Sequence, residues 1–162
     1  MNTEEYYKVL DIERNGETAK AFKMLEQLAQ EGDALAMLDL LARYYSVEGY
    51  AYPVEPLEPD HAKSEAYFFK AKKRFEELSI SGSGEAMRML ASIYLGHWGP
   101  HINKSIEKAE ELLLKAIEAK CCFAANDLAT FYQGSDKEKA KYFYQLAEEN
   151  NCRVIQNDEF ET

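Results

Sequence analysis

The chain has 162 residues, of which 46% are hydrophobic and 30% charged, so it can bury a core and lacks the composition of a disordered chain. It carries 29 acidic and 19 basic residues, a formal charge of −10 that makes nucleic acid and anionic membranes poor partners. The alternative is that the acidity serves solubility alone. Because no apolar run approaches the roughly 20 residues that span a bilayer, and the acidic start lacks a signal pattern, we expect a cytoplasmic protein.

Apolar residues at helical spacing predict an all-α fold of about seven or eight helices. In chain order, the predicted helices cover about 3–13, 17–31, 33–47, 61–80, 84–96, 103–119, 121–133 and 136–150.

Three of these helices repeat one pattern, in which Leu follows Ala by four residues and Tyr follows Leu by four. The three copies are Ala36–Leu40–Tyr44, Ala86–Leu90–Tyr94 and Ala124–Leu128–Tyr132. Steps of four place all three side chains on one face of a helix. Each of these first helices is followed by a second helix with its own stripe of small and large residues. A repeated unit of this kind predicts an α-solenoid of antiparallel helix hairpins.

Turn residues mark the junctions between hairpins. Gly32 and Gly82 stand where a helix end needs a left-handed residue. Lys120 takes that place in the third junction, so we expect a less sharply terminated helix there. Asn103 and Asp136 are the predicted N-caps of the second helices in the last two repeats.

The repeats predict one helical domain over residues 1–151, followed by a flexible acidic tail, 152–162. Within it, residues 1–32 form N-terminal capping helices, and the three repeats cover 33–82, 83–120 and 121–151. The first repeat contains an inserted loop, 48–60, with four acidic residues and no basic one. Its prolines at every third position favour an extended backbone.

The three cysteines leave two alternatives open. Either Cys121 or Cys122 pairs with Cys152 across the last hairpin, or all three thiols are free, as is usual in the cytosol.

We expect no catalytic, cofactor or metal site. His97 and His101 are four residues apart, but Gly99 and Pro100 between them are incompatible with a helical metal-binding pair. An enzyme with a metal site in this loop is the least favoured alternative.

The repeat motifs resemble the Sel1-like repeat family, a relative of the tetratricopeptide repeat. GDALAMLDLLARYY (32–45) matches the opening of the family pattern, with Leu41 in place of its second Gly. Lys108-Ala109 and Lys139-Ala140 match its Lys-Ala step. The resemblance covers about 17–150 and implies an α-solenoid that binds other proteins on a concave surface formed by the first helices.

The resemblance also implies which positions line that surface: one residue before the motif alanine, and two, six and nine after it. The candidates are Leu35, Leu38, Ala42, Tyr45, Glu85, Arg88, Ser92, Leu95, Phe123, Asn126, Thr130 and Gln133. The acidic loop adds Tyr50, Tyr52, Glu55 and Glu58 as candidates for contact with a basic protein. The alternative for the apolar candidates is packing against adjacent helices.

The sequence therefore predicts a non-catalytic protein–protein interaction module. Its most specific form is a bacterial immunity-type inhibitor of a basic toxin, because the chain is small and strongly acidic. The alternative is a general adaptor that recognises a short peptide.

Overall fold

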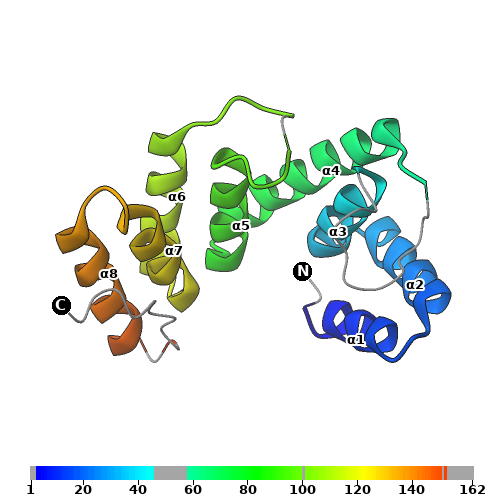
Figure 1. Cartoon of the computed structure of the whole chain (residues 1–162), viewed down its shortest axis with the longest axis horizontal. Coiled ribbons are helices and arrows are strands. Elements are labelled where there is room, and N and C mark those ends of the chain that lie inside the picture. The colour runs from blue at the N-terminus through cyan, green and yellow to red at the C-terminus, as the bar shows by residue number, and fades with distance from the viewer. Residues whose placement is uncertain (1–2, 46–57, 100, 151, 153–162) are drawn as a thin grey trace. The chain divides into compact units, whose positions relative to one another are not determined.

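A computed structural model describes residues 3–45, 58–99, 101–150 and 152. These residues form eight helices and no strand, which confirms the predicted all-α fold (Figure 1). The helices are α1 (Thr3–Arg14), α2 (Thr18–Gln30), α3 (Ala34–Tyr45), α4 (His61–Ile80), α5 (Gly84–Tyr94), α6 (Ile106–Glu118), α7 (Cys122–Tyr132) and α8 (Lys137–Glu149). None of the helices in the described ranges is long and apolar enough to cross a membrane.

The N-cap of α8 is the predicted one, since the Asp136 carboxylate accepts a hydrogen bond from the Lys139 backbone N–H at 3.0 Å. The predicted cap of α6 is wrong. Ser105, not Asn103, accepts from the Lys108 N–H, at 3.4 Å. Ser105 stands directly before the first helical residue, and its own N–H donates to the Tyr94 carbonyl at 3.0 Å, which fixes where α6 begins.

The chain divides into two compact units: Met1–Phe75 with Trp98–His101, and Glu76–His97 with Ile102–Thr162. In unit 1, α1 packs on α2 and α3, and α2 packs on α3. The Ser64 hydroxyl of α4 donates to the Leu41 carbonyl of α3 at 2.9 Å. In unit 2, α5 packs on α6, α6 on α7 and α7 on α8. The division into capping helices and three repeats stays a prediction.

The repeated motif supplies the core of both units. Ala36, Leu40, Ala124 and Leu128 are fully buried, as the steps of four require. The motif tyrosines keep their hydroxyl groups near polar partners, and the Tyr44 hydroxyl lies 3.3 Å from a Glu26 carboxylate oxygen.

The three helix junctions adopt the same turn. Gly32 and Gly82 have φ of +94° and +90°, as predicted, and Lys120 adopts φ of +64°. In each junction, the residue after the left-handed one donates its N–H to a carbonyl of the preceding helix: Asp33 to Leu28, Ser83 to Leu78 and Cys121 to Ala116, at 2.9–3.0 Å. The expected weaker ending at Lys120 is therefore wrong, because its backbone accepts the left-handed conformation despite its Cβ.

A buried charge network attaches α1 to α3. The Arg43 guanidinium donates to both carboxylate oxygens of Glu13, at 2.6 and 2.7 Å, and to Asp39 at 2.6 Å. Tyr6 donates its hydroxyl to Asp39 at 3.1 Å. Burial lowers the pKa of Arg43, but its hydrogen bonds to Glu13 and Asp39 outweigh burial and raise it overall. Arg43 therefore stays charged, and each buried charge has a fixed partner.

A disulfide joins Cys122, at the start of α7, to Cys152, beyond the end of α8. The two Cα atoms lie 5.5 Å apart, within the usual range, and Cys121 is a free thiol. Of the pairings left open by the sequence, the structure has Cys122 with Cys152. Because Cys152 is buried, the packed part of the chain includes a residue that the sequence assigned to the tail.

Candidate functional site

The unit 1 candidates on α3 differ in their exposure. Leu38 is 1% exposed and belongs to the core, so its prediction as a surface contact is wrong. The reason is that both α1 and α2 cover α3, which buries most of its residues. Leu35 is half-buried. Tyr45 is 43% exposed, and its ring lies edge-on to His61 at 5.5 Å and to His101 at 6.2 Å.

Of the predicted acidic loop, Glu58 is described, and its side chain is exposed. Tyr50, Tyr52 and Glu55 lie outside the described residues.

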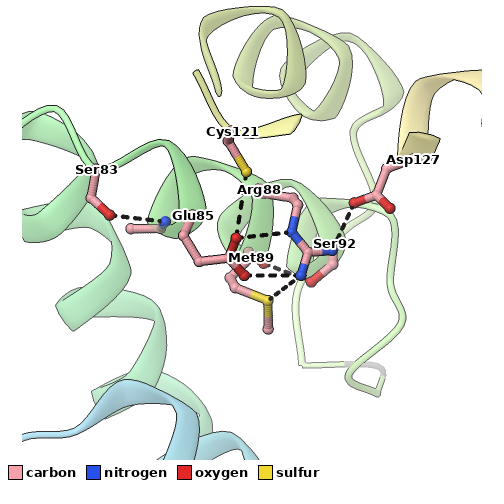
Figure 2. Close-up of polar contacts among 8 residues, drawn as sticks. Ser83, Glu85, Arg88, Met89, Ser92, Cys121 and Asp127 are labelled. Atoms are coloured by element: carbon pink, nitrogen blue, oxygen red, sulfur yellow. Dashed lines mark hydrogen bonds and ion pairs between the residues drawn. The ribbon is translucent and has the colours of Figure 1, made fainter. Parts of the chain in front are cut away.

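In unit 2, side chains of α5 and α7 meet around Arg88, and Figure 2 shows Arg88 between Glu85 and Asp127. The Arg88 guanidinium donates to both carboxylate oxygens of Glu85, at 2.9 and 3.3 Å, and to Asp127 on α7 at 3.1 Å. The same guanidinium lies 5.7 Å from the centroid of the Phe123 ring. We call Glu85, Arg88, Phe123 and Asp127 the Arg88 cluster.

Close packing at the start of α5 positions this cluster. Ser83 caps the helix by accepting the Ala86 N–H at 3.2 Å. A Cβ on the next residue, Gly84, would lie 2.9 Å from the Cys121 Cβ and 3.1 Å from the Ala116 carbonyl oxygen. Glycine therefore lets α5 approach the α6–α7 junction. This approach brings Glu85 within 3.4 Å of the Cys121 thiol.

The charges of the cluster hold one another in fixed states. Burial lowers the pKa of Arg88, but the hydrogen bonds and charges of Glu85 and Asp127 outweigh burial and raise it. Burial, together with the Glu85 charge and hydrogen bond, raises the pKa of Cys121 to about 11. Arg88 is therefore a fixed cation, and Cys121 is a neutral thiol near pH 7 rather than a nucleophile.

Phe123 is the most exposed member of the cluster, with 53% of its surface open to solvent. An aromatic ring and an arginine side by side are the residue types that dominate protein interfaces. Because the guanidinium is already paired twice and lies by the ring, little side-chain freedom is left to lose on binding.

Of the remaining unit 2 candidates, Thr130 is exposed, and Ser92, Leu95 and Gln133 are half-buried. Leu95 packs against the core of this unit, and the Gln133 side-chain oxygen accepts a hydrogen bond from the Tyr144 hydroxyl at 3.4 Å. Asn126 is also half-buried. Sequence reasoning missed Asp127, although Asp127 stands four residues after Phe123 and so shares its helix face.

One histidine of the α5–α6 loop, His101, lies among aromatic side chains. The His101 ring packs against Phe68 of unit 1, with 4.6 Å between ring centroids. Across the described ranges, no three His, Cys, Asp or Glu side chains gather as a metal-ligand set.

No family model matches the sequence, and no curated protein matches it either. Two solved structures are similar to this chain. A Sel1 repeat protein from Oxalobacter formigenes shares 17% identity, with a TM-score of 0.46 over 81% of this chain and 49% of that one. A protective antigen of uropathogenic Escherichia coli strains, described as displaying an SLR fold, shares 19% identity, with a TM-score of 0.44 over 82% of this chain and 34% of that one.

Both structures carry the Sel1-type repeat that the sequence resembles. The chain spans half or less of the length of either protein.

Proposed function

We propose that this chain is a non-catalytic protein–protein interaction module. Its partner docks on exposed side chains of the first helices, among them the Arg88 cluster of α5 and α7, and the acidic segment 48–60 supplies further contacts. The observation that carries the proposal is the Arg88 cluster, where a half-exposed phenylalanine lies beside an arginine that two carboxylates hold in place.

The proposed partner is a basic protein, because the chain has a formal charge of −10. The most specific form of the proposal is an immunity-type inhibitor that blocks a basic toxin in the cytoplasm. Long-range attraction between such partners speeds their encounter, so the association rate falls steeply as salt rises.

Site-specific crosslinking from α7 tests the docking face. In one variant of the full chain, a photoreactive benzoylphenylalanine replaces Phe123. In a second variant of the same chain, it replaces Tyr142 of α8. Tyr142 is 59% exposed, similar to Phe123, but it lies on α8, which is the second helix of its hairpin and lies outside the proposed docking face. We expect one partner to crosslink from position 123 and not from 142. Equal crosslinking from both positions, or from 142 alone, would contradict the proposed face.

Alanine variants then measure the contribution of the ring. Phe123→Ala removes an exposed side chain and should weaken the captured complex by about 2 kcal/mol or more, the loss of an interface hot spot. Tyr142→Ala is the matched control and should leave affinity unchanged. Full affinity of the partner for Phe123→Ala would rule out this mode of binding. An association rate that does not change with salt concentration would also rule it out.

A further inference from the structure

Unit 1 contains a pocket on the side chains of α2, α3 and α4 that the proposed function does not use. Its volume is about 170 Å³, and its lining consists of Glu26, Tyr44, Lys63, Ala66, Tyr67 and Lys70. All six residues lie in the same compact unit.

The second helix that lines this pocket, α4, is longer than the other second helices. α4 has 20 residues, whereas α6 and α8 have 13 each. In α8, Lys139 precedes Ala140 in the Lys-Ala step, and its ammonium lies 4.4 Å from the centroid of the Tyr132 ring. The additional N-terminal turns of α4 carry Lys63 and Tyr67 and change this arrangement.

Tyr67 takes the place beside the motif tyrosine. Its ring stacks on Tyr44, with 6.0 Å between centroids and 11° between planes. Lys70 precedes Ala71 at the corresponding place in α4, but its ammonium lies 5.8 Å from the Tyr67 ring centroid instead. Lys63 lies 4.9 Å from the Tyr44 ring centroid. Two stacked rings therefore separate two ammonium groups on one helix face.

The charges around the pocket leave one cation available for a ligand. The Glu26 carboxylate already accepts the Tyr44 hydroxyl at 3.3 Å, and Lys63 lies 3.8 Å from Asp60. Lys70 has no ion pair within the described part of the chain. Burial and the charge of Glu26 raise the pKa of both tyrosines, so both phenols remain neutral donors at neutral pH.

We propose that this pocket binds a carboxylate joined to an apolar group. Lys70 supplies a charge-assisted hydrogen bond to the carboxylate, the charge of Lys63 adds attraction at longer range, and Tyr67, Tyr44 and Ala66 supply the apolar contact. A single negative charge fits better than a doubly charged phosphate, because Glu26 and Asp60 offset part of the lysine charge. The carboxylate belongs either to a free organic acid or to the C-terminal residue of a polypeptide.

Titration of the isotopically labelled full chain with small ligands tests the proposed pocket. Backbone amide NMR shifts report the binding. The probes are 3-phenylpropionate, its neutral amide, phenyl phosphate, and a pentapeptide ending in Phe as the free acid or the amide. We expect saturable shifts at residues 63–70 with the acids and none with the amides. Tighter binding of the peptide acid identifies a polypeptide end as the source, whereas equal or weaker binding identifies a free acid.

Variants that remove one lysine charge distinguish binding in this pocket from nonspecific attraction of the acid to the protein surface. Lys70→Met should weaken binding about tenfold, the loss typical of one charge-assisted hydrogen bond. Lys141→Met makes the same charge change on the exposed surface of α8 and should have no effect. Ala66→Leu tests the space itself: Ala66 is exposed, so the larger side chain fills the pocket without disturbing the core and should abolish binding.

Binding of the amides as tightly as the acids, full affinity in Lys70→Met, or preference for phenyl phosphate would each overturn the proposal. Phe123→Ala should leave this binding unchanged, so failure here is distinguishable from failure of the proposed docking face.

Discussion

At the scale of single residues, the Arg88 cluster controls the chemistry of the one free thiol. Glu85 accepts from Cys121 at 3.4 Å and also pairs with Arg88, so one carboxylate serves both neighbours. A pKa near 11 rather than the ordinary value near 9 means about a hundredfold less thiolate at pH 8. Cys121 is therefore expected to be unreactive although it is only half-buried.

Replacement of the carboxylate tests this explanation. Glu85→Gln removes the negative charge that helps to raise the pKa of Cys121, so iodoacetamide should alkylate Cys121 severalfold faster at pH 8. The raised pKa also makes stability depend on pH. The thiol of the unfolded chain ionises at a lower pH than the thiol of the folded chain, so the free energy of unfolding falls as pH rises from about 9 to about 11. Mass spectrometry of the Cys121 peptide measures the rate. Unchanged alkylation in Glu85→Gln would show that burial alone protects the thiol.

Residue patterns in the sequence predicted the buried motif positions but not the buried charges. Alanine, leucine and tyrosine at steps of four predict a packed stripe, because this period places them on one face of a helix. Glu13 and Arg43 are 30 residues apart and belong to different helices, so no local spacing reveals their pairing. Leu38 was assigned to the surface for the same reason, because only the packing of α1 and α2 on α3 decides its burial.

At the scale of elements, the junction turns recur with different residues. A non-glycine residue in the left-handed region carries a cost of roughly 1–2 kcal/mol, and Lys120 bears it. Lys120→Gly should therefore stabilise the protein by about 0.5–1 kcal/mol, part of the relief being offset by the freedom that glycine gains in the unfolded chain. Urea denaturation measures the change.

Gly82 provides the matched control for this turn. It has φ of +90°, and a Cβ there would meet nothing within 4 Å, so Gly82→Ala reports the backbone cost without a clash. We expect a loss of about 1 kcal/mol. A destabilised Lys120→Gly would mean that the lysine side chain makes a contribution larger than the backbone strain.

The helices were predicted more accurately than their connections. The ends of α4 match the predicted 61–80, and the other helix ends that were predicted within the described residues differ by three residues or fewer. Hydrophobic periodicity and left-handed junction residues define these limits well. The pocket was not predicted, because it depends on how the extra turns of α4 meet Tyr44 and Glu26, which are distant in sequence.

At the scale of the whole molecule, the disulfide bears on where the protein resides. Cys122 and Cys152 are 30 residues apart, so their bond closes nearly all of the last hairpin. Disulfides persist in oxidising compartments and are rare in reducing ones. The bond and the proposed cytoplasmic location therefore point in different directions.

Thiol counting tests the bond directly. The unreduced native chain should expose one alkylatable thiol after denaturation, and the reduced chain three. Reduction should lower the free energy of unfolding by roughly 3–4 kcal/mol, the loop-closure value for this separation. Cys121→Ser should retain the whole effect. Three reactive thiols without reductant, in protein kept from reducing conditions, would show that the bond does not form.

In a protein built from helix hairpins, the effect of a core substitution on stability should be local. The reason is that each helix packs on its neighbours in the chain rather than on one core shared by all helices. Leu25 in α2 and Leu128 in α7 are both fully buried, and they belong to different units. Each Leu→Ala change should cost about 2–5 kcal/mol through the cavity that it leaves. Hydrogen exchange then distinguishes a local from a global loss. Leu128→Ala should reduce protection mainly in α7 and α8, and Leu25→Ala mainly in α1–α3. If both variants lower protection equally in all eight helices, the two units unfold as one cooperative body and the repeat description of stability is wrong.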